Sequence, residues 1–288
     1  LNLDDENSEN AEVTAPEQIN FNQALKILEG LLSDPSVLKI GHNIKYDAQV
    51  LASYGIQISP FDDTMLLSYV LDCGRHAHNL DELSMLHFDH KNIKFKDIAG
   101  SGKSQITFDK IGLEKALDYA AEDADMTWRL FERLKPQLVD QSMVTVYETL
   151  ERPLISVLTE MERRGIKVDA EELKRLSDDF AFRLSDLEKQ VYDLAGREFN
   201  VASPKQLGEV LFDEMGLPGG KKGKTGAYAT GVEILEKLAT DGHQLPRMVL
   251  EYRQLAKLKS TYTDALTAQI NPTTGRVHTS FSMAGTST

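Results

Sequence analysis

Hydrophobic positions recur at steps of three and four residues along much of the chain, and the longest regular run covers residues 113–137. This spacing places side chains on one face of an α-helix, so the run predicts one long amphipathic helix. Its apolar positions are Leu113, Leu117, Ala120, Ala121, Ala124, Trp128 and Phe131. Tyr119 and Asp123 lie four residues apart, about one helical turn on the same face. The run therefore predicts a helix that presents a hydroxyl beside a carboxylate.

The residues before this helix alternate between helical and strand patterns. Residues 1–18 are acidic and poor in apolar residues, which indicates a loop or disordered lead-in. We then expect a helix over 21–32, a strand over 37–41, a helix from 46 to 55, a strand over 56–61 and helices over 65–71 and 80–86. Strands alternating with helices predict a layered α/β domain.

The residues after this helix have mainly helical patterns. Helices are expected over 144–164, 170–195, 205–215, 232–239 and 245–268, and a strand over 276–281. Residues 216–231 are rich in glycine and lysine and predict a loop. We expect three regions, an α/β domain over 1–139, a helical domain over 140–270 and a segment over 271–288 that carries a strand.

Composition narrows the class of protein. The 288 residues carry a net charge of −13, so any contact with nucleic acid must use local basic patches. The single cysteine, Cys73, rules out an internal disulfide and fits a reducing cytoplasm. No apolar run is long enough to cross a membrane, which predicts a protein without a membrane partner.

The segment Gly100-Ser101-Gly102-Lys103-Ser104 has some features of a phosphate-binding loop. A Walker A loop requires glycine five residues before the glycine of Gly-Lys-Ser, and Asp97 occupies that position. The segment is therefore interpreted as a flexible basic loop.

Four residues in two segments carry the candidate chemistry. Asp47 alone reads as a favourable acid in the first turn of a helix. The pattern Asn43-x-x-x-Asp47 followed by Tyr119-x-x-x-Asp123 resembles the second and third motifs of the DEDDy 3′→5′ exonucleases. In that superfamily four carboxylates hold two metal ions, which stabilise the attacking and leaving oxygens of a phosphodiester.

The resemblance implies a ribonuclease H-like α/β exonuclease domain that uses Mg²⁺ or Mn²⁺. Asp123 would bind the ion that activates water, Asp47 the second ion, Tyr119 would position the water, and Asn43 would order the site or the substrate end. The first motif of the superfamily, an Asp-x-Glu on an early strand, has no match here. We expect truncation rather than decay of the site, and we expect this fragment alone to be inactive.

A second resemblance covers the helical half. Residues 251–264 and 271–280 are similar to the end of the thumb and the entry to the palm of bacterial family A DNA polymerases, and 203–207 and 165–169 match thumb segments. This implies a monomeric cytoplasmic, nucleoid-associated parent that uses deoxynucleotides to extend a primer–template and excises mispaired single-stranded 3′ ends. The expected DNA-binding residues are Lys221, Lys222, Lys224, Arg253, Lys257, Lys259, Arg276 and His278. Lysine and arginine neutralise phosphates without reading bases.

Two alternatives remain open from the sequence. One is a stand-alone DEDDy exonuclease of the ribonuclease D type, and the other is a non-catalytic DNA-binding scaffold with a decayed exonuclease fold. Several residues are assigned to structure rather than function. His76 and His78 lack an evident third metal ligand, Trp128 is expected in the core, and Cys73 is expected to be a small buried residue.

Overall fold

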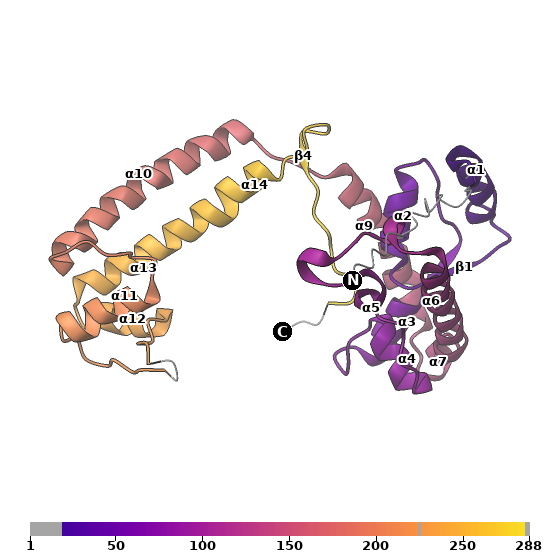
Figure 1. Cartoon of the computed structure of the whole chain (residues 1–288), viewed down its shortest axis with the longest axis horizontal. Coiled ribbons are helices and arrows are strands. Elements are labelled where there is room, and N and C mark those ends of the chain that lie inside the picture. The colour runs from indigo at the N-terminus through magenta and orange to yellow at the C-terminus, as the bar shows by residue number, and fades with distance from the viewer. Residues whose placement is uncertain (1–18, 224–225, 286–288) are drawn as a thin grey trace, which may run out of the picture. The chain divides into compact units, whose positions relative to one another are not determined.

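The computed structural model describes residues 19–223 and 226–285. Contacts divide the chain into two compact units, unit 1 (residues 1–163 and 280–288) and unit 2 (residues 164–279) (Figure 1). Residues 140–163 therefore pack with unit 1. The expected borders between exonuclease domain, thumb and palm, at 139/140 and 270/271, stay predictions.

The sheet of unit 1 consists of two short parallel strands. Strand β1 (Lys39–Gly41) pairs with β2 (Phe61–Asp63) in a register that aligns Lys39 with Phe61. The strand expected over 56–61 is wrong apart from its last residue. The N–H of Ile56 donates to the carbonyl of Leu51 at 3.1 Å, and that of Ser59 donates to Leu32 at 3.1 Å. These N–H groups are therefore bonded to the preceding helices and are not available to a β-sheet. Pro60 has no N–H to donate to a neighbouring strand.

Helices make up most of the rest of unit 1. They are α1 (Phe21–Leu32), α2 (Ile44–Ala52), α3 (Thr64–Asp72), α4 (Leu80–Phe88), α5 (Phe95–Ala99), α6 (Leu113–Leu134), α7 (Gln137–Asp140), α8 (Val144–Val146) and α9 (Arg152–Arg164), with short 3₁₀ turns η1 (Gly102–Ser104) and η2 (Phe108–Lys110) and a π-helical turn η3 (Tyr147–Glu151). The carboxylate of Asp63 caps α3, accepting from the N–H of Met65 at 2.9 Å.

The core of unit 1 lies where α3 packs against the C-terminal half of α6. Leu66, Leu67 and Leu130 are fully buried there. The buried residues of α6 begin only at Met126. The N-terminal half of α6 therefore has no buried residue and can border an open surface.

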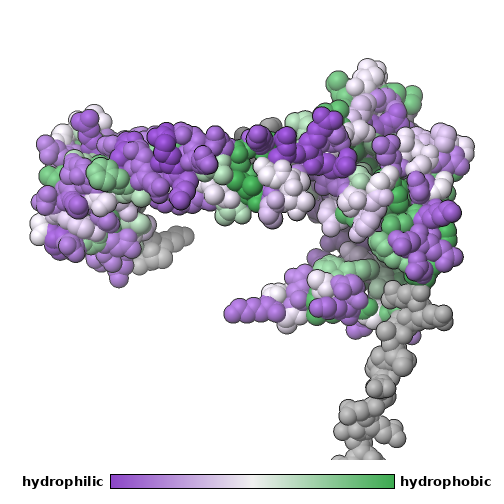
Figure 2. Space-filling view, turned by 90° about the horizontal axis from the view of Figure 1, so that it is seen from above, coloured by the Kyte–Doolittle hydropathy of each residue, from purple (hydrophilic) through white to green (hydrophobic). Residues whose placement is uncertain are grey.

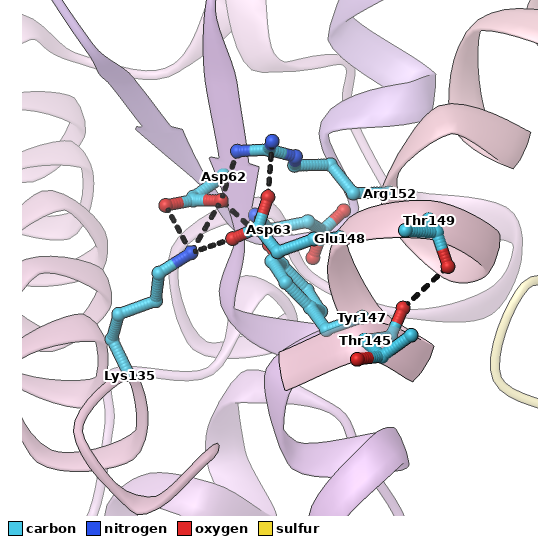
Figure 3. Close-up of polar contacts among 8 residues, drawn as sticks. All are labelled: Asp62, Asp63, Lys135, Thr145, Tyr147, Glu148, Thr149 and Arg152. Atoms are coloured by element: carbon cyan, nitrogen blue, oxygen red, sulfur yellow. Dashed lines mark hydrogen bonds and ion pairs between the residues drawn. The ribbon is translucent and has the colours of Figure 1, made fainter. Parts of the chain in front are cut away.

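A buried carboxylate ties β2 to the end of α6 and to the helix that follows (Figure 3). Asp62 is 1% exposed and forms ion pairs with Lys135 at 3.0 Å and Arg152 at 3.3 Å. The hydroxyl of Tyr147 donates to it at 2.9 Å, and Glu148 pairs with both cations. A buried charge is tolerated only when it is paired and hydrogen-bonded, and this cluster meets that condition.

Unit 2 is a long helical arm. Helix α10 (Ala170–Ala195) lies beside α13 (Gln244–Lys257), which continues as the π-helical η5 (Leu258–Asp264) and α14 (Ala265–Ala268) (Figure 1). The core sits at the far end, where α11 (Pro204–Gly208), the π-helical η4 (Glu209–Glu214) and α12 (Val232–Thr240) meet the arm. Hydrophilic side chains predominate on the face of the arm shown in Figure 2. The helix expected over 170–195 is confirmed at both ends.

The strand expected over 276–281 is shorter in the structure. Only β4 (Arg276–Val277) pairs, antiparallel to β3 (Ile166–Lys167). Its partner is short because Asp169 already caps α10, accepting from the N–H of Glu171 at 3.1 Å. None of the helices in the described part of the chain is long and apolar enough to cross a membrane.

Candidate functional site

An open groove of about 870 Å³ in unit 1 brings together three of the residues that the motifs predict. Asp47 of α2 and Tyr119 and Asp123 of α6 all line it. The walls come from β1, α2, the start of α4 and the middle of α6. The two motifs, distant in the sequence, therefore share one surface.

The start of α2 is fixed by a carboxylate on the neighbouring strand. Asn43 adopts a left-handed backbone with φ of +60°, and its side chain does not cap the helix. Asp63 instead accepts from the N–H of Asn43 at 3.1 Å and of Ile44 at 2.8 Å. Because β1 and β2 are paired, this contact places the first turn of α2, with Asp47, at the end of the sheet.

The opposite side of α2 is held by Glu162 of α9. Lys45 forms a buried ion pair with Glu162, with side chains 6% and 4% exposed, and Gln49 donates to the same carboxylate. Lys45 and Gln49 lie four residues apart and share one face. Asp47, two residues from each, points away from that face and toward the groove.

The groove concentrates negative charge. Burial raises the pKa of Asp47 above its usual value. Burial also raises the pKa of Asp123, and repulsion from Glu122 and Asp81 adds to the rise, while a hydrogen bond from the hydroxyl of Tyr119 opposes it. Burial and the charge of Asp123 raise the pKa of Tyr119, which keeps its proton. Burial is the main cause of all three shifts, and repulsion between neighbouring acidic groups contributes to those of Asp123 and Tyr119.

Carboxylate and hydroxyl oxygens fit a hard divalent cation such as Mg²⁺ or Mn²⁺. Among the residues that the structure describes, no lysine or arginine forms an ion pair with Asp47, Asp81 or Asp123. No group of three or more acidic, histidine or cysteine side chains in that part of the chain converges as a metal site. Mg²⁺ commonly takes one or two carboxylates and completes its shell with water and substrate phosphate, which this donor set allows.

Sequence reasoning missed two residues of the groove and misplaced a third. Asp81, in the first turn of α4, and His42, directly after β1, both line it, and only the fold brings them there. Trp128 also lines the groove and is 54% exposed, so its assignment to the core is wrong. The assignment of Cys73 to a buried position is also wrong, because the residue is exposed.

Asn43 does not line this groove. It lines a neighbouring cavity of about 270 Å³ with Lys45, His78 and residues 280–284, and Asn79 borders both spaces. Its expected role in ordering the site or the substrate end stays a prediction.

The basic residues expected to bind DNA lie in unit 2, and several of them have partners within it. Arg253 donates to the carbonyl of Thr230 at 2.5 Å, and Lys259 pairs with Asp264 at 2.7 Å. Arg276 donates to the carbonyl of Gly165 at 3.2 Å. These three side chains therefore also stabilise the unit.

The other basic residues of this set are more open. Lys221 and Lys257 are exposed, and Lys222 lies 4.6 Å from the ring centroid of Tyr228. The imidazole of His278 is bonded to the hydroxyl of Thr274 at 2.8 Å. Lys224 lies outside the described residues. DNA binding by this set stays a prediction.

Comparison with known proteins agrees with this fold. Residues 6–139 match the family model described as 3′-5′ exonuclease, and residues 170–288 match that of DNA polymerase family A. The DNA polymerase I of Rhizobium leguminosarum is 53% identical over 274 residues, covering 95% of this chain and 27% of that protein. The DNA polymerase I of Pseudomonas aeruginosa is 46% identical over 273 residues, covering 93% and 30%.

A solved structure agrees as well. The POL domain of Pol1 from M. smegmatis, in complex with DNA primer-template and dNTP, superposes with a TM-score of 0.73 at 27% identity, covering 92% of this chain and 42% of that one. The chain thus spans about a quarter to a third of the length of the curated relatives.

The chain belongs to family A of the DNA polymerases, as a ribonuclease H-like exonuclease region followed by a mainly helical polymerase region. Within the family, the relatives it matches are the bacterial DNA polymerases I. The match over residues 170–288 is one that a stand-alone exonuclease would not give.

Proposed function

We propose that this chain carries the proofreading site of a bacterial DNA polymerase I and part of the surface that holds its DNA. The groove would hydrolyse the terminal phosphodiester of a single-stranded 3′ end. One observation carries the proposal, namely that Asp47, Tyr119 and Asp123 line one groove with uncompensated negative charge. In the parent protein, the regions beyond this chain would extend a primer on its template with deoxynucleotides.

Asp123 and Asp47 would hold the divalent ions, Mg²⁺ or Mn²⁺, of which the complete site would take two. The ions, when bound, supply charge stabilisation for the attacking and leaving oxygens and lower the pKa of bound water. Tyr119 keeps its proton because its pKa is raised, so its hydroxyl can orient the water that attacks phosphorus. Glu162, through Lys45 and Gln49, keeps Asp47 directed into the groove.

Unit 2 would hold the DNA backbone. Exposed Lys221, Lys222 and Lys257 can neutralise phosphates without reading the sequence. The mycobacterial relative, solved with primer-template DNA, supports this assignment. We infer a monomer that works at the bacterial nucleoid in the cytoplasm.

The test uses the full-length parent protein and its Asp123→Ala variant. With Mg²⁺ and a 3′-labelled single-stranded oligonucleotide, we expect the variant to lose digestion by at least about 100-fold, the scale for removing a group that stabilises transition-state charge. Primer extension should be retained. Equal digestion by both proteins would overturn the proposal, and absence of digestion in both would indicate a decayed exonuclease fold kept as a scaffold.

A further inference from the structure

Residues 91–110, which we call the lysine loop, connect α4 to α6 and differ in charge from the rest of the chain. They contain five lysines (Lys91, Lys94, Lys96, Lys103 and Lys110) against two aspartates, whereas the whole chain has a net charge of −13. All five lysines are exposed. Within the described residues, none of the five forms an ion pair, so their charge is directed to solvent.

The lysine loop is anchored at its base. Glu122 of α6 accepts from the N–H of Ile93 at 2.6 Å and contacts His90 at 2.8 Å. Ala99 is buried, and its carbonyl accepts from the N–H of Ile106 at 2.9 Å. These contacts fix the backbone beside α6 while the lysine side chains remain outside.

Aromatic rings connect the lysine loop to the groove. The ring centroids of Phe95 and Phe108 each lie 6.1 Å from that of Tyr119 and 6.5 Å from each other. Tyr119 lines the groove, and Phe108 remains 45% exposed. The loop is therefore a basic wall that borders the groove and carries an exposed ring.

We propose that the lysine loop is a binding surface for single-stranded DNA just upstream of the 3′ end that the groove receives. Proteins that bind single-stranded DNA without sequence preference use two features. Exposed lysines neutralise the phosphates along the DNA, and aromatic rings stack on its bases. Lys103 and Lys110 contact phosphates, and the ring of Phe108 stacks on a base. This inference rests on the proposed function, because the groove must receive a 3′ end.

The test measures binding rather than cleavage, on the chain of 288 residues itself. A fluorescent oligothymidylate is titrated in EDTA, which prevents hydrolysis, at several salt concentrations. The Lys103→Gln/Lys110→Gln variant should bind roughly tenfold more weakly at low salt. Its salt slope should be smaller by about 1.4, at about 0.7 per phosphate contact on a single strand.

The Phe108→Ala variant separates stacking from charge. It should weaken binding about fivefold or more while leaving the salt slope unchanged, because base stacking releases no counterions. The matched control is Lys26→Gln/Arg133→Gln, which removes two positive charges from exposed positions elsewhere in unit 1 and should bind like the unchanged chain.

Three results would overturn the inference: unchanged binding by both loop variants, an equal loss in the control, or full competition by polyglutamate, which would indicate a general anion surface. Circular dichroism of each variant confirms that it is folded. If the loop variants bind normally while Asp123→Ala abolishes digestion in the full-length protein, the loop inference fails and the proposed function stands.

Discussion

At the scale of single residues, the contacts of His42 after β1 determine which nitrogen of its imidazole carries the proton. Its Nδ1 lies 2.9 Å from the hydroxyl of Thr64, and that hydroxyl donates to the carbonyl of Gly41 at 3.1 Å. Since the hydroxyl proton is already used, we assign the proton of the ring to Nδ1, which donates to Thr64. Nε2 is buried, and burial lowers the pKa of His42 to about 4 against the opposing effect of the backbone of His78.

This pKa predicts a pH-dependent stability. The unfolded chain binds a proton at His42 near pH 6.5 and the folded chain only near pH 4, so stability is present above pH 6.5 and is lost as the pH falls through this window. Between pH 7.5 and 5 the unchanged chain should lose roughly 2 kcal/mol more unfolding free energy than His42→Asn, whose amide can replace the Nδ1 donor. Urea unfolding at both values measures this difference, and equal losses would contradict it.

Gly165, which ends α9, is a second residue with a testable constraint. Its φ is +65°, and a Cβ there would lie 2.9 Å from the carbonyl oxygen of Val277. Gly196 has a similar φ of +74° with open space around it. We expect Gly165→Ala to destabilise unit 2 by about 2–3 kcal/mol and Gly196→Ala by about 1 kcal/mol, because only the first adds a clash to backbone strain. Thermal unfolding measures the stability of both variants. Equal losses of stability would show that β4 shifts to make room for the added Cβ at position 165.

The residues that the sequence could predict are those whose signal is local. Tyr119 and Asp123 share a helix face, and the spacing alone places them together. Asp81 and Trp128 join the groove only because α4 packs against α6, and no local pattern encodes that contact. Trp128 follows the helical period but lies on the side of α6 that borders the groove, so periodicity misassigned it.

At the scale of elements, the contact between α2 and α9 depends on one carboxylate. Glu162 accepts from Lys45, from Gln49 and, at 2.7 Å, from the backbone N–H of Phe281. Glu162→Ala should cost about 3–5 kcal/mol of unfolding free energy, because it leaves the ammonium of Lys45 buried and unpaired. The double variant Lys45→Met/Glu162→Leu should recover part of this loss, because it removes the unpaired ammonium but still leaves Gln49 and the N–H of Phe281 without their acceptor. Urea unfolding tests the cycle, and a cost below about 1 kcal/mol for the single variant would contradict it.

Helices were predicted better than strands for a physical reason. Helix α10 begins at the cap Asp169 and ends before Gly196, and both signals lie in adjacent sequence. A strand forms only where a neighbouring strand supplies backbone N–H and C=O groups for hydrogen bonds. Ile56 and Ser59 donate their N–H groups to helix carbonyls, Pro60 has no N–H, and β4 stops where its two-residue partner stops.

At the scale of the whole molecule, unit 1 is assembled from two separate stretches of chain. Residues 280–285 follow the arm in sequence, yet they pack with the helices before residue 164. Sequence patterns suggested one continuous strand over 276–281 and gave no sign of this return. The reason is that Phe281 is held through its backbone, donating to Glu162 and accepting from Lys45, so its side chain carries no signal.

This return has a consequence for protein engineering. A chimera that exchanges the proofreading domain between relatives at a single junction would leave Lys45 and Glu162 facing a transplanted backbone. Because that backbone contributes only an N–H and a carbonyl, any residue except proline can supply it at position 281. The graft should therefore tolerate sequence divergence at position 281, provided that an apolar residue fills the buried position of Met283 and that the path of the chain is kept.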